Sequence, residues 1–225
     1  ETIDLRNSGL TFQGAGGTSM TWSSSYAGAA FGGRDDATFA ATIKDLSITT
    51  TYAGTAAQGR GVSWYHDAWA TSRSADLTLS NVALNTTGDG LSIRASTGGG
   101  SMQSPVTVNV SDSDIASSVG NGIYVQGAQG YASGAVALLH LNDSRVESFE
   151  NGVQLRTYSG AGNAPTPDFL VQRSEILSNN PADDAYKGII TNGNSDSDPL
   201  LIADTLAAGF GIAVSAAQPS TYADG

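Results

Sequence analysis

Apolar and polar residues alternate in short runs along this chain, and one run recurs. Its eight-residue unit reads apolar, any, apolar, polar, Asn or Asp, small, any, apolar, as in residues 108–115 (VNVSDSDI). Similar units begin at residues 3, 41, 77, 108, 139, 169 and 200, in steps of 38, 36, 31, 31, 30 and 31 residues. A spacing that settles near 31 residues is typical of a solenoid in which each repeat stacks on the next.

A second motif, Gly-apolar-any-apolar, follows the units, as in residues 122–125 (GIYV) and 152–155 (GVQL). Alternation with a period of two predicts a β-strand, and the glycine before it is expected at a bend where only a residue without a Cβ fits. Each repeat is therefore about three short strands joined by turns. The fold class that follows is all-β, a parallel β-helix solenoid of about seven coils.

The same spacing predicts one β-helix domain over residues 1–225. Residues 1–40 form an irregular first coil that includes a long Gly-rich return over residues 23–40. Residues 41–214 form the regular coils, and residues 215–225 form a tail without a strand signal.

Stacking turns equivalent positions into columns of neighbouring side chains. The fifth position of the unit predicts a left-handed turn, because Asn and Asp tolerate that geometry. Its members are Asn7, Asp45, Asn81, Asp112, Asp143, Arg173 and Asp204. The seventh position alternates in charge through Asp114, Arg145 and Glu175. Two interior columns are expected, one of Ile115, Val146 and Ile176 and one of Ile123 and Val153.

The net charge and the composition limit the kinds of partner that the chain is expected to bind. The chain carries ten Lys and Arg and a net charge of −11, with no basic stripe, so nucleic acid is an unexpected partner and direct membrane insertion of this segment is not expected. It has no Cys, which excludes disulfides and thiolate metal sites. It has no apolar run of 18 residues, so no transmembrane helix is expected, and its first residues are not expected to be a signal peptide.

Catalysis by a β-helix needs acids or bases on an exposed strand face. The predicted outward row of the third strands has none: Ser19, Ser63, Ser92, Tyr124, Gln154, Ile190 and Ala213. The outward row of the first strands has one Asp and one distant His: Asp4, Thr42, Thr78, Asn109, His140, Leu170 and Leu201. Residues 85–90 (NTTGDG) faintly resemble a segment of polygalacturonases, without the acids that complete it. We therefore expect no enzyme, no catalytic residue and no cofactor.

Metal binding has one candidate. Residues 192–198 (NGNSDSD) alternate oxygen ligands like a calcium loop, but the loop lacks Gly at its sixth position and has Ala203 where Glu belongs. No metal site is predicted, and calcium at this segment stays an open alternative.

Two sets of residues are candidates for binding. Tyr65, His66 and Trp69 follow the core residue Trp64 in an expected return loop, where exposed aromatic rings stack on sugars or a partner. The outward columns turn apolar at the C-terminal coils, which predicts a self-association surface. Its residues are Leu170, Ile190 and Leu201.

The Gly-Ile/Val-any-apolar strands, the Asp-Ser-any-Val turns and stretches such as residues 142–157 (NDSRVESFENGVQLRT) resemble passenger domains of bacterial autotransporters, the pertactin and AIDA-like group. The resemblance covers essentially the whole chain. It implies a right-handed parallel β-helix, type V secretion, an extracellular place on the bacterial surface through a C-terminal domain outside this sequence, and a role in virulence. It also implies adhesion to a host or bacterial glycan or protein, or self-association.

Two alternatives stay open, a polysaccharide-active lyase or hydrolase and a structural stalk.

Overall fold

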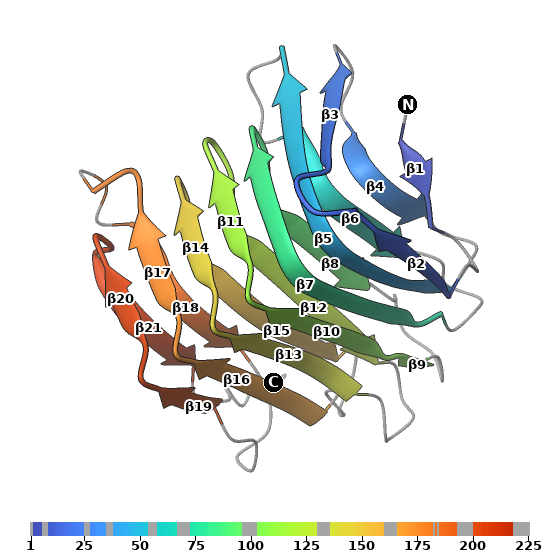
Figure 1. The fold of residues 1–225 in the computed structure, drawn as a ribbon. Coiled ribbons are helices and arrows are strands. Elements are labelled where there is room, and N and C mark those ends of the chain that lie inside the picture. The colour runs from blue at the N-terminus through green and yellow to red at the C-terminus, as the bar shows by residue number, and fades with distance from the viewer. Residues whose placement is uncertain are drawn as a thin grey trace.

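Strands follow the repeats along the chain. The computed structural model describes residues 2–5, 9–24, 28–34, 38–53, 58–66, 73–95, 103–129, 136–159, 166–181, 183, 185–192 and 200–217. The regular elements in these ranges are all β-strands, which stack as a parallel β-solenoid (Figure 1). In the described part of the chain no helix is long and apolar enough to cross a membrane.

Sheet A contains the strands that begin at the Gly-apolar motif. Neighbours along it pair in parallel, and the short strand β9 (Gln103–Ser104) joins β12 antiparallel. The order is β1 (Ile3–Asp4), β4 (Ala29–Arg34), β6 (Arg60–His66), β8 (Leu91–Ala95), β12 (Ile123–Gln129), β15 (Val153–Ser159), β18 (Lys187–Asn192) and β21 (Ile212–Ala217).

Sheet B contains both strands of the eight-residue unit, because β5 (Phe39–Tyr52) and β7 (Ala75–Thr86) run through both positions without a break. The strands at the first position are β2 (Leu10–Gln13), β10 (Val106–Ser111), β13 (Val136–Asn142), β16 (Thr166–Gln172) and β19 (Leu200–Ala203). Those at the second are β3 (Ser19–Ser24), β11 (Asp114–Ser117), β14 (Arg145–Ser148), β17 (Glu175–Ser178) and β20 (Leu206–Ala208).

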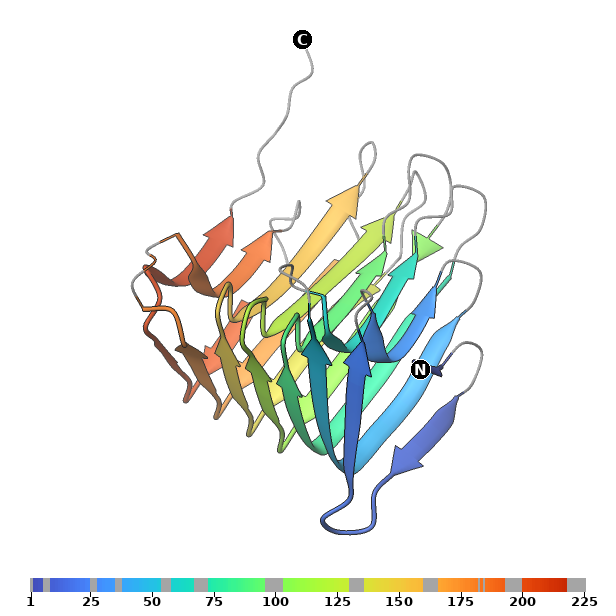
Figure 2. The same cartoon turned by 90° about the horizontal axis from the view of Figure 1, so that it is seen from above.

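Successive repeats lie side by side along one axis, and the colour runs in order from blue to red (Figure 2). The parallel β-solenoid predicted from the repeats is therefore confirmed. About five turns are supported, and the count of seven coils is not confirmed.

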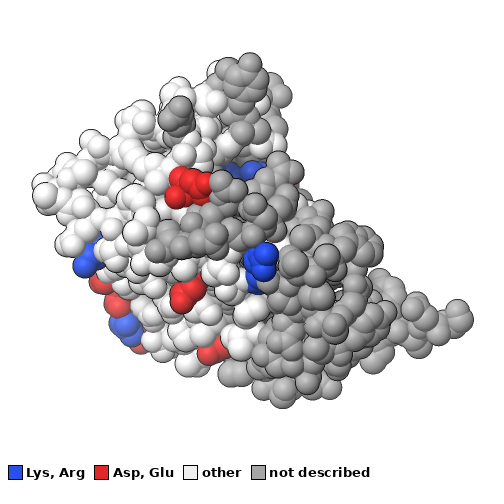
Figure 3. All heavy atoms as spheres, turned by 90° about the vertical axis from the view of Figure 1, so that its right-hand side faces the viewer, with Lys and Arg blue, Asp and Glu red and all other residues white. Residues whose placement is uncertain are grey.

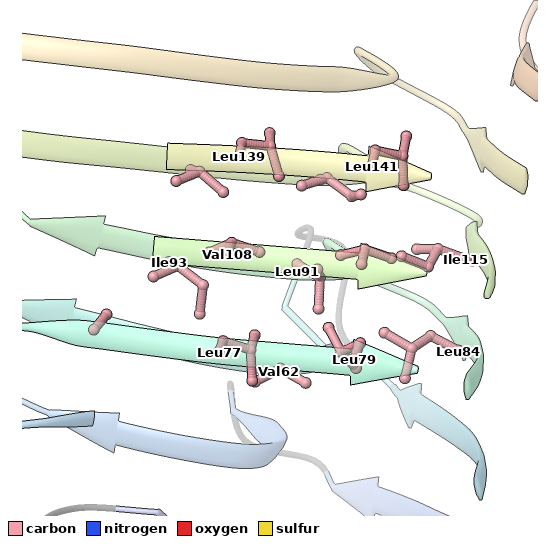
Figure 4. Close-up of a cluster of buried hydrophobic side chains, with 14 of the residues drawn as sticks. Val62, Leu77, Leu79, Leu84, Leu91, Ile93, Val108, Ile115, Leu139 and Leu141 are labelled. Atoms are coloured by element: carbon pink, nitrogen blue, oxygen red, sulfur yellow. The ribbon is translucent and has the colours of Figure 1, made fainter. Parts of the chain in front are cut away.

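The interior is a set of aliphatic columns between the two sheets (Figure 4). The two columns predicted from the sequence are paired in register and fully buried. One contains Ile115, Val146 and Ile176, and the other contains Ile123 and Val153. Burying one such side chain stabilises the fold by about 1.5–3 kcal/mol. Every repeat contributes to these columns, so the stability of each depends on its neighbours.

The corner between the two strands of the unit is left-handed, as predicted. Every non-glycine residue found there with a positive φ belongs to the fifth position: Asp45, Asn81, Asp112, Asp143, Arg173 and Asp204. After Asp112, Asp143 and Arg173 the next residue is a serine whose hydroxyl accepts a hydrogen bond from a backbone amide of the preceding coil. The Ser144 hydroxyl donates to the Asn142 carbonyl at 2.6 Å and accepts from the Ser113 amide at 3.1 Å. At this turn the hydrogen bonds between strands are interrupted, and the serine side chain provides the partners that the buried backbone groups need.

The glycine of the Gly-apolar motif lies at a bend where only a residue without a Cβ fits, as the sequence predicts. Gly122 does not need a left-handed φ; a Cβ there would lie 2.2 Å from Cγ1 of Val146 and 2.7 Å from the carbonyl oxygen of Gly152. The neighbouring coil approaches too closely for any side chain. Gly90 and Gly152 meet the same obstacle, so the motif marks contact between coils.

The first coil is where the predicted register is wrong. Residues 3–10 do not form one unit, because β1 pairs with β4 in sheet A and β2 pairs with β5 in sheet B. β3 pairs with the second half of β5, so Ser19 does not belong to the third-strand row. The expected Gly-rich return contains β4. At the other end, β21 extends to Ala217, into the expected tail.

Candidate ligand-binding face

The outer face of sheet A contains the third-strand row that the sequence singled out. Pairing confirms five members in register: Ser63, Ser92, Tyr124, Gln154 and Ile190. The ends differ from the expectation, because Gly32 precedes Ser63 and Ser215 follows Ile190. These are the positions at which the sequence placed Ser19 and Ala213.

A second row lies two residues further along the same strands and is charged. It consists of Tyr65, Arg94, Gln126 and Arg156, paired in register across β6, β8, β12 and β15. Side chains two apart on a strand point to the same face. The row of outward residues predicted from the sequence covers only one position per strand and leaves this second row out, although the same period of two identifies it.

The carboxylate of Asp89 anchors this face from below. Its side chain is 3% exposed, and Oδ2 lies 3.2 Å from Arg94 Nη2 and 3.5 Å from Arg60 Nε. Oδ1 accepts from the Asn121 amide at 3.0 Å and from Asn121 Nδ2 at 3.1 Å. A buried carboxylate needs such partners, because unpaired charge away from water is costly. Both arginines are thereby held at defined places on the face.

Asp89 is one end of a ladder of amide side chains at the corner before each Gly-apolar motif. Asn121 Oδ1 accepts from Asn151 Nδ2 at 3.0 Å, and Asn151 Oδ1 accepts from the Lys187 amide at 3.1 Å. At the end of the ladder a carboxylate replaces the amide, and the next residue in the column is Arg60. The ladder therefore passes from amides to an ion pair at β6.

Tyr124 connects the two rows. Arg94 Cζ lies 4.2 Å from the centre of its ring, a cation–π contact. Its hydroxyl donates to Gln126 Oε1 at 2.7 Å and accepts from Arg156 Nη1 at 3.2 Å. The charged row is thus fixed laterally as well as from below.

A hollow of about 450 Å³ opens on this face above β4, β6 and β8. It is lined by Gly33, Arg60, Ser63, Trp64, Tyr65, Ser92 and Arg94. A second hollow beside it shares Gly33, Arg60 and Ser63 and adds Asp4 among its lining residues. Glycines at 32 and 33 carry no side chain on β4, so the face is open there.

Glu150 lies at the same corner as Asp89, and its pKa is affected by burial and by the charges of Asp89 and Arg94. Burial raises its pKa above the usual range, the negative charge of Asp89 raises it further, and Arg94 lowers it. The proton on Glu150 is therefore held more tightly than in an exposed glutamate.

The predicted aromatic cluster divides. Tyr65 is 39% exposed and lines the hollow, but it lies in β6 and not in a return loop. His66 ends β6 and is completely buried, with its ring stacked on Trp64 at 5.7 Å between centroids. The expectation of His66 as an exposed loop residue is thus wrong, because the strand continues two residues further. Trp69 lies outside the described residues.

The predicted self-association residues also divide. Leu170 and Leu201 pair in register on the outer face of sheet B, where Leu201 is 51% exposed. Ile190 lies in sheet A and is only 6% exposed, so it does not share their surface. The structure adds Val136 and Leu138, which occupy outward positions of β13 next to the same patch. His140 and Asp168 form an ion pair there at 3.2 Å.

Metal ligands do not gather among the residues that the structure describes: no three His, Asp or Glu side chains are placed to hold an ion. Of the candidate calcium segment, residues 192–198, only Asn192 at the end of β18 is described. No protein-family model, no curated protein and no solved structure matches this chain.

Proposed function

We propose that this protein is a non-enzymatic adhesin of a bacterial cell surface. It would be a right-handed parallel β-helix of about seven coils, displayed outside the cell, that binds a host or bacterial glycan on the outer face of sheet A. The observation that carries this proposal is the hollow over β4, β6 and β8, with Tyr65 and two arginines on its walls.

The chemistry of the hollow suits a sugar. An exposed aromatic ring offers a surface on which a sugar ring stacks, while guanidinium and hydroxyl groups bind its oxygens. Ligand pockets are typically about 300–1,000 Å³, a range that includes this hollow.

The arrangement favours binding over turnover. Both oxygens of Asp89 are engaged by Asn121 and by the two arginines, and the Tyr124 hydroxyl already takes part in two hydrogen bonds. A general acid or base must reach the proton that it transfers. A polysaccharide lyase or hydrolase is the alternative, and release of unsaturated or reducing ends from pectin, alginate or glycosaminoglycans would establish it.

A glycan and host-matrix binding screen with the full chain tests the proposal. Tyr65→Ala is expected to weaken binding of the glycans that the parent retains, because it removes the stacking surface. Tyr186→Ala makes the same change just before β18, outside the residues that line the hollow, and is the matched control that is expected to bind like the parent. A parent that binds no glycan, or a Tyr65→Ala variant that binds as the parent does, contradicts the proposal.

Self-association is a second candidate, favoured by the apolar patch of Val136, Leu138, Leu170 and Leu201 on sheet B. Exposed apolar patches mark interaction surfaces. The double variant Leu170→Asp with Leu201→Asp is expected to abolish association and cell aggregation, without unfolding. The control Thr78→Asp with Asn109→Asp places the same charges earlier in the same column. A parent that sediments as a monomer at high concentration would leave this candidate without support.

A further inference from the structure

The hollow is lined by two guanidinium groups and by no carboxylate, although the carboxylates of Asp89 and Glu150 lie at the same corner. Arg60 and Arg94 share one carboxylate, Asp89, which lies beneath them. Their side chains are 25% and 33% exposed, so both reach the surface of the hollow. The chain as a whole has a net charge of −11. A local positive charge that is partly shielded from water attracts an anion more strongly than the same charge on an open surface.

The lining places that anion in one of the two hollows. Asp4 lines the second hollow and repels a negative group there. The hollow over β6 and β8 has no carboxylate among its lining residues and offers the hydroxyls of Ser63 and Ser92 beside the guanidinium groups. Tyr65 forms an apolar wall of the kind on which a sugar ring stacks.

The charged row extends the binding surface along the solenoid axis. Arg94, Gln126 and Arg156 are in register on β8, β12 and β15, so Arg156 lies two strand spacings from Arg94, about 9–10 Å. That distance is comparable to the repeat of a disaccharide. A linear polymer lying along the axis would meet a positive charge at Arg94 and another at Arg156.

We propose that this face binds an acidic polysaccharide, with the negative group of one sugar unit held by Arg60 and Arg94 and the polymer running along the axis towards Arg156. The inference rests on the proposed glycan-binding function and specifies its ligand class. The negative group is a carboxylate or a sulfate, since guanidinium groups form paired hydrogen bonds with either oxyanion.

Paired probes that differ only in charge test the ligand class. Oligogalacturonate and its methyl ester form the carboxylate pair, and dextran sulfate and dextran form the sulfate pair. The parent is expected to bind the charged member of at least one pair ten-fold or more tightly than the neutral member, and to lose that preference in high salt. The pair that shows the preference identifies the negative group. Equal binding of charged and neutral members in both pairs overturns the inference.

Single Arg→Gln variants test where the polysaccharide binds. Arg94→Gln is expected to weaken binding of the preferred probe ten-fold or more, and Arg156→Gln to weaken it less. Arg173→Gln makes the same charge change at a distant corner and is expected to bind like the parent. Wild-type affinity in both Arg94→Gln and Arg156→Gln overturns the proposal. If Arg94→Gln fails to fold, Arg156→Gln and the paired probes decide.

The two proposals fail differently. A parent that retains neutral glycans as well as acidic ones keeps the adhesin proposal and loses this inference. A parent that binds no glycan in any arm loses both.

Discussion

Two corners of the solenoid hold ion pairs, and the closer pair is expected to be the weaker one. At the left-handed corner Arg173 donates two hydrogen bonds to Asp143, of 2.6 and 2.7 Å. Both side chains are well exposed, Arg173 at 51% and Asp143 at 43%. At the other corner Asp89 contacts Arg94 and Arg60 at 3.2 and 3.5 Å but is 3% exposed. Exposed pairs contribute little, whereas removing one partner of a buried pair is costly. The expected contribution of each ion pair to stability therefore follows the burial of its side chains and not the distance between its atoms.

The corners also differ in how positive and negative groups are arranged. At the left-handed corner Arg145 lies 3.5 Å from Asp114 and 3.9 Å from Glu175, so charges alternate from coil to coil. In the space-filling view, acidic and basic atoms lie next to one another along the left-hand edge (Figure 3). At the Asp89 corner two guanidinium groups share one carboxylate. The left-handed corner has more carboxylates than arginines, whereas at the other corner Arg60 and Arg94 face the carboxylates of Asp89 and Glu150.

The largest effect is expected for Asp89→Ala. It leaves two guanidinium groups and the Asn121 amide without their acceptor, and we expect it to lower the free energy of unfolding by roughly 3 kcal/mol. Urea unfolding measures this, with Asp143→Asn as the exposed control, because asparagine keeps the left-handed turn at residue 143 and removes only the charge. No resolvable change is expected for this control. Asp89→Asn preserves the shape and is expected to lie between the two. A loss below about 1 kcal/mol for Asp89→Ala would contradict the ranking by burial.

A neutral buried hydrogen bond should rank next. Ser144→Ala removes the acceptor of the Ser113 amide at the left-handed corner, which leaves a buried donor unpaired. We expect a loss of about 1–3 kcal/mol in urea unfolding. Ser111→Ala, which removes a hydroxyl from an outward position of β10, is the matched control and should have little effect. Equal losses in the two variants would show that burial is not the cause.

Glu150→Gln should have a smaller effect and the opposite sign. Burial and then the charge of Asp89 raise the pKa of Glu150 in the folded state, so the folded protein binds this proton more tightly than the unfolded chain. Stability is therefore lost as the pH rises from the unfolded pKa through the folded one. The neutral amide removes that loss, and we expect a higher urea midpoint than the parent at neutral pH. An unchanged difference between the two proteins from pH 4 to pH 8 would contradict this.

Arg173→Ala should have the smallest effect on stability but a measurable one on titration. Hydrogen bonding to Arg173 lowers the pKa of Asp143, so its contribution is present above the unfolded pKa and lost as the pH falls through the folded one. In the variant the pKa of Asp143 should rise towards its usual value, while the urea midpoint at neutral pH stays unchanged. Titration by NMR measures the first and urea unfolding the second. A pKa of Asp143 that does not move would show that the bidentate contact is absent in solution.

The sequence predicted the left-handed corner well because its signal repeats. Position five carries Asn or Asp in six of its seven predicted members, and the exception, Arg173, still takes the same φ because its neighbours in the stack impose the geometry. The first coil does not follow the repeat. Its strands pair across an altered spacing, and residues 3–10 match the unit by composition alone.

The candidate site was harder to predict because its members come from different positions of the repeat. Asp89 and Arg60 stand before motif glycines in neighbouring coils, and Arg94 is the penultimate residue of β8. The residue type varies among the coils at both positions, so no single residue type marks them in the sequence. Only the stacking register brings them together. Tyr65 was identified from its residue type, and His66 was misplaced because the end of β6 carries no turn signal.

The most direct test of the central claim, that the outer face of sheet A is the binding face, is hydrogen exchange of the full chain with and without saturating oligogalacturonate. Dextran sulfate replaces it if the sulfate pair shows the preference. Slower exchange is predicted in residues 60–66 and 91–95, which surround Arg60, Tyr65 and Arg94, and no change in residues 143–148 and 172–178. Protection confined to the left-handed corner, or none at saturation, would contradict the account.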